Sequence, residues 1–289
     1  MPGQEDKMDL LFHIVFALFA VSAGVSLLTY AFFWYENYPR FRGQGPDAPD
    51  LACSQLIEGI VSSIASMILV VIFFPLGFLP RFRRPQRISP LQPVIVLIHG
   101  LYHNASASTI FRHRLGRAGF DNLYSFQYRS LFTSFERTYS RLDAFLRRLR
   151  AEFPGQDIIL VGHSLGGLLS RVYAERCPQD SPPRAVITLG TPHKGSKMAA
   201  FGIGTLASSL IYRGPLFEEL ERSANRLPCT GVVLYSPTDN LVIPSEGLET
   251  PYPGWLSRRT PAMSHVAMLY SPVVAREVVE FLKTTEQSS

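Results

Sequence analysis

The 289-residue chain has few of the residues that build disulfides or cofactor sites. Its three cysteines, Cys53, Cys177 and Cys229, are odd in number and show neither metal-ligand spacing nor an obvious disulfide pattern, which fits a reducing compartment. The sequence contains no clustered metal ligands, no dinucleotide-binding fingerprint and no phosphate-binding loop. We therefore expect neither a metal nor an organic cofactor.

Charge is also scarce, at 18% of residues, whereas hydrophobic residues make up 46% and the mean hydropathy is +0.10. The net charge of +5 comes mainly from arginine, and several arginines share the helix-like segment RTYSRLDAFLRRLR at 137–150. No nucleic-acid recognition motif or aromatic-interleaved basic patch accompanies them, so we expect no nucleic-acid partner. The pattern is typical of a solvated helix face, with contact to anionic lipid headgroups as the alternative.

Two long apolar segments lie near the N-terminus, at about residues 10–35 and 57–79. The first carries no charge and the second none after Glu58, and each is long enough to cross a bilayer as a helix. A signal peptide is the alternative for the first, but the run is too long, its leading charge is mixed, and no small-x-small cleavage site follows. We predict a two-helix transmembrane hairpin within residues 1–80, then a basic linker at 81–90.

Basic residues near these segments predict their orientation. Five lie on the side shared by both ends of the hairpin and two lie in its loop: Lys7, Arg81, Arg83, Arg84 and Arg87 against Arg40 and Arg42. Under the positive-inside rule this bias places the N-terminus and the C-terminal domain in the cytoplasm. We further expect that deleting the residues before Pro80 leaves an active domain.

After Pro90 the pattern changes to β-type runs that alternate with helical ones. The runs lie at 94–98, 122–128, 158–161, 185–189 and 231–235. Strands this apolar on both faces, alternating with helices, predict an α/β fold with a mostly parallel sheet covered on both sides. In such sheets a site lies at the carboxyl ends of the strands.

A serine follows the third of these strands within Gly-His-Ser-Leu-Gly at 162–166. Between a strand and a helix, G-x-S-x-G is the signature of a nucleophile elbow, which exposes the serine oxygen of Ser164. The backbone N–H of Leu165 can then donate to a developing oxyanion. A second N–H is expected from Leu101, which follows the first strand and His99-Gly100.

A serine nucleophile needs a base and an acid that orients the base, in the chain order Ser, Asp or Glu, His. Asp239 follows the fifth strand and His265 lies before the last helical segment, so both fit. Glu246 and Glu249 remain alternatives for the acid. His103 and His113 remain alternatives for the base, although only His265 follows the acid.

Five motifs together carry a family resemblance: VIVLIHGL, VGHSLGGLLSR, TLGTPHKGS, SPTDNLVIP and SHVAML. Their order and spacing over residues 91–282 resemble the α/β-hydrolase fold, in particular bacterial triacylglycerol lipases and esterases. The resemblance implies a hydrolase domain at 91–289 with Ser164 as nucleophile, Asp239 as acid, His265 as base, and Leu101 and Leu165 as oxyanion-hole residues.

The apolar, glycine-punctuated segment at 196–227 lies where this fold usually carries a lid, although a plain core helix would give the same pattern. We interpret the chain as a membrane-anchored serine hydrolase that cleaves lipid-like carboxylic esters, with a lipid or ester substrate and the membrane as its partners. Acyl transfer would use the same residues. A catalytically idle hydrolase fold that acts as a membrane-tethered binding module is the alternative from another class.

Overall fold

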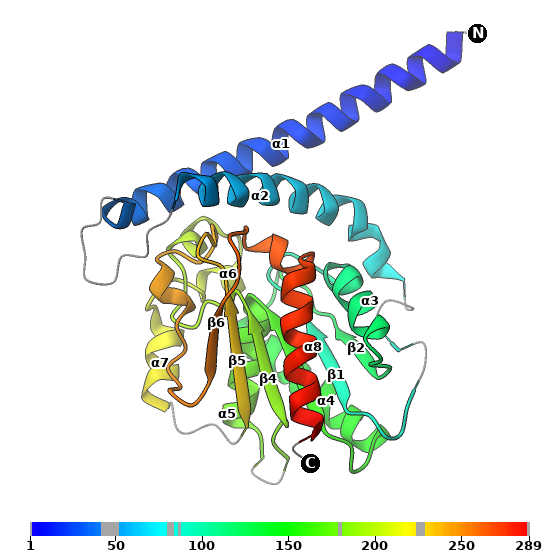
Figure 1. Ribbon diagram of the computed structural model, residues 1–289, viewed down its shortest axis with the longest axis vertical. Coiled ribbons are helices and arrows are strands. Elements are labelled where there is room, and N and C mark those ends of the chain that lie inside the picture. Colours follow the sequence, from blue (N-terminus) through cyan, green and yellow to red (C-terminus); the bar gives the residue numbers. More distant parts are fainter. Residues whose placement is uncertain are drawn as a thin grey trace.

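The computed structural model describes residues 2–41, 52–79, 84–85, 88–178, 181–223 and 229–287. A parallel sheet flanked by helices forms the body of the molecule, and two long helices, α1 (Pro2–Phe41) and α2 (Cys53–Phe73), cross over one end of it (Figure 1). Half of the predicted linker at 81–90 and the end of the predicted lid, at 224–227, lie outside the described residues.

The sheet has six strands in the order β2-β1-β3-β4-β5-β6, and every neighbouring pair is parallel. This confirms the predicted fold class. The strands are β1 (Val94–Ile98), β2 (Leu123–Phe126), β3 (Ile158–His163), β4 (Ala185–Leu189), β5 (Thr230–Tyr235) and β6 (Leu256–Arg259). The sequence did not predict β6, because this edge strand reads Leu-Ser-Arg-Arg and all four residues are exposed.

Helices cover both faces of the sheet because successive strand residues point to opposite sides. In β1, Val94 and Val96 join the core formed with α4 (Phe135–Glu152) and α5 (Leu165–Arg176). Ile95 and Leu97 join a second core with α3 (Thr109–Arg117) and α8 (Pro272–Gln287). The uninterrupted apolar runs of the sequence therefore correspond to strands buried on both faces.

Short elements follow the carboxyl ends of the strands. They are η3 (Ala105–Ser108), η4 (Lys197–Phe201), α6 (Thr205–Ser208), α7 (Pro215–Ser223), η5 (Ser245–Leu248) and η6 (Val266–Leu269). Within the predicted lid, four apolar side chains are buried in the core with α5, namely Leu206, Leu210, Phe217 and Leu220. Phe201 and Ile203 of the same segment are exposed.

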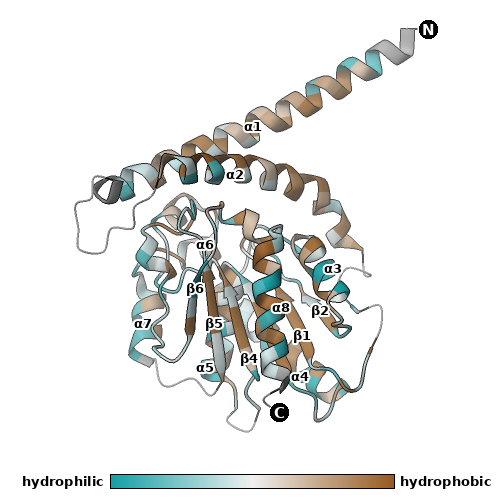
Figure 2. Ribbon diagram, in the orientation of Figure 1, coloured by the Kyte–Doolittle hydropathy of each residue, from teal (hydrophilic) through white to brown (hydrophobic). Residues whose placement is uncertain are grey.

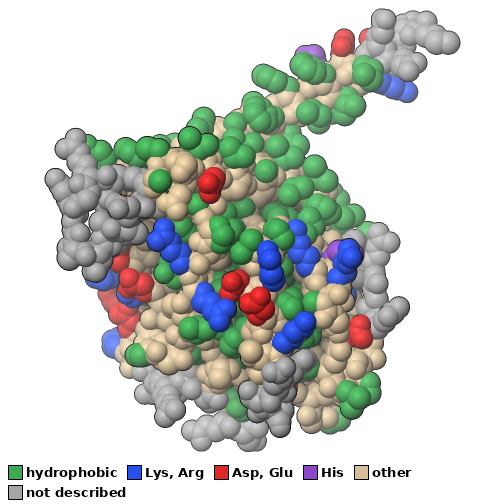
Figure 3. All heavy atoms as spheres, in the orientation of Figure 1, with side chains coloured by type: hydrophobic (Ala, Val, Ile, Leu, Met, Phe, Trp, Pro, Cys, Tyr) green, Lys and Arg blue, Asp and Glu red, His purple; other side chains and the backbone are tan. Residues whose placement is uncertain are grey.

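Both N-terminal helices are long and apolar enough to cross a membrane. Figure 2 shows α1 and α2 as largely hydrophobic, and Figure 3 shows apolar side chains gathered over both of them, while most charges lie on the domain beneath. The early part of α1 stands clear of the domain, whereas α2 lies along it and continues as η1 (Phe74–Phe78) (Figure 1). Polar side chains of α1 and α2 are buried on the inner side: Ser22, Ser26, Thr29, Asn37, Ser63 and Ser66.

Candidate active site

Ser164 forms the junction between β3 and α5, in the left-handed region of the backbone with φ 55° and ψ −124°. A non-glycine residue rarely adopts this conformation, and it is the geometry of a nucleophile elbow. The flanking glycines permit the tight turn. A Cβ on Gly162 would lie 2.3 Å from the backbone of Gly166, and one on Gly166 would lie 2.1 Å from the carbonyl oxygen of Ile98.

Leu165 and the loop that carries Leu101 both lie beside this elbow. Leu165 is the first residue of α5, where N–H groups have no acceptor within the helix. The loop after β1 also touches the nucleophile, because a Cβ on Gly100 would lie 3.0 Å from the Cβ of Ser164. The next residue in that loop is Leu101. The structure thus brings Leu165 and the loop that carries Leu101 next to Ser164.

Asp239 and His265 are paired below the surface. The Oδ2 atom of Asp239 lies 2.8 Å from Nδ1 of His265, and both residues are almost fully buried. The Oδ1 atom accepts hydrogen bonds from the backbone N–H groups of Leu241 and Val242, at 3.0 and 2.9 Å. These three contacts fix the carboxylate in the loop after β5.

The alternative acids and bases have other surroundings. Glu249 is exposed and forms an ion pair with Lys194 at 2.7 Å. His113 is exposed on α3. His103 is near the site, since its ring stacks at 6.3 Å on that of His163, which lies 4.6 Å from the ring of His265.

Three further histidines surround the pair and are held neutral by burial. Burial lowers the pKa of His99 to about 4 and that of His103 to about 3, and it lowers the pKa of His163 well below its ordinary value. His163 Nε2 lies 3.0 Å from the carbonyl oxygen of His265, so the neutral imidazole donates there and holds the backbone of its neighbour. These rings add no positive charge beside His265.

The N-terminal helices contact the loops that carry Asp239 and His265, which the sequence did not predict. Tyr30 of α1 donates to the carbonyl oxygen of Thr238 at 2.9 Å. Thr29 accepts from Asn240 Nδ2 at 2.8 Å, while Asn240 Oδ1 accepts from the N–H of His265 at 3.1 Å. A chain of two hydrogen bonds therefore joins α1 to the backbone of His265.

Helix α2 and η1 make similar contacts. Ser62 accepts from the N–H of Ser264 at 2.8 Å, and Ser66 lies 3.4 Å from the Ser264 hydroxyl. In the loop after β1, Asn104 donates to the carbonyl oxygen of Phe74 at 2.9 Å. The only sequence signal for these contacts was the recurrence of Ser and Thr every three or four residues in otherwise apolar helices, a pattern typical of helix interfaces.

The parallel sheet, the serine elbow after β3 and the buried Asp-His pair define a hydrolase architecture. The sequence model of the alpha/beta hydrolase family matches residues 95–285, and the chain belongs to this family. This confirms the resemblance inferred from the five motifs.

Curated relatives match over short segments. The chain is 42% identical over 50 residues to a GPI inositol-deacylase from Candida albicans. This match covers 17% of this chain and 13% of the relative. It is 41% identical over 61 residues to a triacylglycerol lipase from Pseudarthrobacter phenanthrenivorans. This match covers 21% of this chain and 18% of the relative. The chain therefore spans less than a fifth of the length of either relative.

Solved structures share the fold at low sequence identity. The mature Bacillus licheniformis lipase BlEst2 aligns with a TM-score of 0.57 and 18% identity, over 68% of this chain and 95% of that one. Aspergillus fumigatus lipase B aligns with a TM-score of 0.53 and 15% identity, over 70% and 55%. The chain thus has the fold of a lipase-like α/β hydrolase.

Proposed function

We propose that the chain is a membrane-anchored serine hydrolase that cleaves carboxylic esters of lipid-like substrates through an acyl-enzyme on Ser164. One observation carries the proposal: a buried Asp239-His265 pair, 2.8 Å apart, lies at the same sheet edge as the strained elbow of Ser164. Strain at a non-glycine residue persists where surrounding structure holds it, as at catalytic sites. A purely binding module has no need of this set.

Each residue has a role in the proposed reaction. Ser164 Oγ attacks the ester carbonyl while His265 accepts its proton, and the N–H groups of Leu101 and Leu165 stabilise the oxyanion. His265 returns the proton to the leaving alcohol, and water then cleaves the acyl-enzyme with the same base. Asp239 fixes the imidazole with Nδ1–H toward its own Oδ2, so that Nε2 is the basic nitrogen.

The two apolar helices support the membrane part of the proposal. The first part of α1 exposes large apolar side chains around its circumference, among them Leu10, Phe12, Ile14 and Phe16. Water is a poor solvent for such a surface, and the hydrocarbon core of a bilayer is a good one. With the basic bias of the flanking residues, we place the hydrolase domain on the cytoplasmic side.

Labelling with a fluorophosphonate tests the nucleophile. The full chain in detergent micelles should react with the probe, and Ser164→Ala should abolish labelling and lower ester hydrolysis by on the order of a thousandfold or more. Ser140→Ala, on the exposed surface of α4, is the matched control and should retain both. Labelling that survives Ser164→Ala would refute the assignment. A series of esters of increasing acyl length would then define the substrate class.

A further inference from the structure

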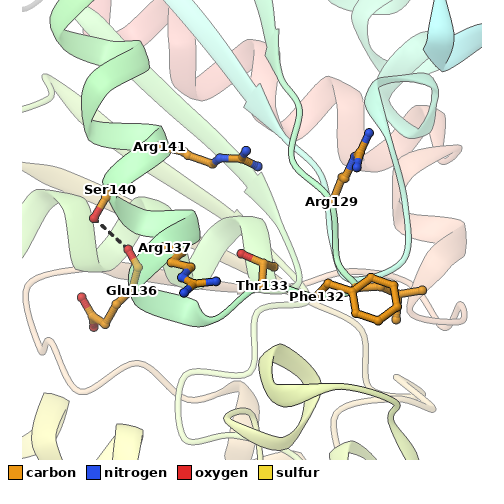
Figure 4. A pocket seen from close by; sticks show the side chains of 8 residues that line it. Arg129, Phe132, Thr133, Glu136, Arg137, Ser140 and Arg141 are labelled. Atoms are coloured by element: carbon orange, nitrogen blue, oxygen red, sulfur yellow. Dashed lines mark hydrogen bonds between the residues drawn. The ribbon is translucent and has the colours of Figure 1, made fainter.

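Three arginines that the catalytic chemistry does not use surround one pocket beside the loop after β2. The pocket has a volume of about 500 Å³ and lies between that loop and the first turns of α4. Arg129 comes from the loop, whereas Arg137 and Arg141 come from α4, and Figure 4 shows their guanidinium groups around the same space, with Thr133 between them. The pocket thus concentrates positive charge and hydroxyl groups.

This charge is not neutralised within the described part of the chain, where none of the three guanidinium groups pairs with a carboxylate. The acidic residue at the pocket, Glu136, is engaged elsewhere, because both its oxygens accept from Arg176 at 3.0 Å. Like charges held together without a counter-charge repel each other. An anion is the ligand that complements such a pocket.

The loop also presents an aromatic side chain to the outside. Phe132 is 98% exposed and has a φ of 58°, which is a true outlier for a bulky residue. Its neighbour Leu131 is 44% exposed. Because Phe132 is exposed, packing within the fold does not offset the strain of its backbone. A contact with another molecule is the better explanation of this conformation.

Phe132 belongs to an apolar rim that joins the pocket to the N-terminal helices. The rim consists of the exposed residues Leu131, Phe132, Phe201 and Ile203. Tyr102 holds the two parts of this rim together: its N–H donates to Ser130 at 2.7 Å, and its hydroxyl donates to the carbonyl oxygen of Ile203 at 2.8 Å. Ile203 is 75% exposed. The ring of the nearby Phe201 packs at 5.0 Å on Phe32 of α1. The exposed apolar surface thus continues from the loop to α1.

We propose that this pocket binds the phosphate headgroup of an anionic phospholipid while Phe132 inserts among the acyl chains, so that the domain docks on the bilayer in which it is anchored. Arginine forks match phosphate geometry, and an aromatic ring at the level of the headgroups is typical of membrane-interface contacts. The proposal rests on the proposed membrane anchoring. It explains the charge of the pocket and the exposure of Phe132 together.

The expected contribution of the pocket is measurable. Each basic side chain near an anionic leaflet strengthens binding about fivefold, so the three arginines together contribute on the order of a hundredfold to the docking equilibrium. The attraction is screened by salt, because the Debye length falls to about 3 Å at 1 M. Docking should therefore need anionic lipid and low or moderate salt.

Hydrogen exchange of the full chain in nanodiscs tests the proposal without using activity. We compare discs of phosphatidylcholine with discs that also contain phosphatidylglycerol, and follow amides in the 127–137 segment. Protection should appear only in the anionic discs, and it should be lost at 1 M salt. It should also be lost in the triple variant Arg129→Gln, Arg137→Gln, Arg141→Gln, and weakened in Phe132→Ser.

A triple variant with the same change in charge is the control. Arg147→Gln, Arg148→Gln and Arg276→Gln alter exposed arginines outside the pocket and should keep the protection. Equal protection in neutral and anionic discs, or its survival in the pocket variant, would overturn the proposal. Protection by inorganic phosphate alone, in detergent and to the same extent, would overturn the lipid assignment in favour of a small-anion site. Failure of the chain to remain in any disc would instead overturn the anchoring.

Discussion

Both oxygens of the Asp239 carboxylate have hydrogen-bond partners, Oδ2 with His265 and Oδ1 with two backbone N–H groups. Replacing one of these oxygens by nitrogen should therefore change turnover strongly. Asp239→Asn keeps the shape but places an amide beside Nδ1 of His265, which favours the wrong tautomer. Turnover should fall by orders of magnitude while the thermal midpoint changes little. Steady-state kinetics on a dispersed ester and a thermal melt measure the two effects.

The two glutamates provide the comparison. Glu246→Gln and Glu249→Gln should each lower turnover by less than about tenfold, which corresponds to roughly 1.4 kcal/mol of barrier. If either glutamine variant is as inactive as Ser164→Ala while Asp239→Asn stays active, the acid that orients His265 is a glutamate of this loop and not Asp239.

The neutral histidines around the site predict how stability depends on pH. Burial lowers the pKa of His99 to about 4 and of His103 to about 3, so the folded state keeps both neutral where an unfolded chain would bind protons. Their contribution is complete above a pH of about 6.5 and is lost as the pH falls toward 4, by up to about 1.4 kcal/mol per pH unit for each ring. Melts of the full chain in detergent should therefore show a falling midpoint between pH 6.5 and 4.

The variant His103→Gln removes one of these protonation sites and should flatten that dependence. A midpoint that does not change between pH 6.5 and 4 would show that these rings do not take up protons on unfolding. Because thermal stability is the readout, the result does not depend on the residue that acts as the base.

At the scale of single residues, the sequence predicts those candidate site residues that belong to a continuous local motif or follow a fixed chain order. Ser164 was recognisable because the elbow is a continuous strand-turn-helix pattern, and chain order then singled out Asp239 and His265. The role of Asn240 was not recognisable, because its two partners, Thr29 and the backbone of His265, come together only in the folded chain.

At the scale of elements, α2 has two faces that an average of hydropathy cannot distinguish. Ile57, Val61, Val71 and Ile72 are exposed, whereas Ser63 and Ser66 are buried. The length and low charge of α2 were predictable, since they depend on composition alone. Its contact with the loop at Ser264 was not, because a few hydroxyl groups change the mean hydropathy little.

Removing one hydroxyl from α1 tests whether these contacts position His265, the proposed base. Thr29→Val keeps the shape of the side chain but leaves Asn240 Nδ2 buried without its acceptor, at a cost of about 1–3 kcal/mol. We expect turnover to fall by roughly tenfold with an unchanged KM, because Asn240 also holds the backbone of His265. Leu28→Ala, on the outer side of the same turn, should leave turnover unchanged.

The same contacts change the expectation for a chain that lacks both helices. From the sequence, deletion of the residues before Pro80 was expected to leave an active domain. In the structure that deletion would remove the partners of Thr238, Asn240 and Ser264 at once. Full turnover from the truncated chain, or from Thr29→Val, would show that the helices only anchor the domain.

At the scale of the whole molecule, the proposed orientation in the membrane rests on charge. Five basic residues flank the hairpin on the side of the hydrolase domain and two lie in its loop, so a reporter fused after the C-terminus should be active only if it works in the cytoplasm. Protease added to intact cells should spare the domain. Cleavage of the domain from outside would refute this orientation but not the chemistry proposed for Ser164.

The contacts between the N-terminal helices and the loops of Asp239 and His265 also impose a timing on biosynthesis. Ser264 follows its partner Ser62 by 202 residues, and Asn240 follows Thr29 by 211. At about 5–20 residues per second, a ribosome needs on the order of 10–40 s to make the later partner after the earlier one has emerged. If the helices anchor the chain as proposed, they can enter the bilayer well before the loop of His265 exists. A nascent chain then lacks the Asp239-His265 pair until residue 265 has been made.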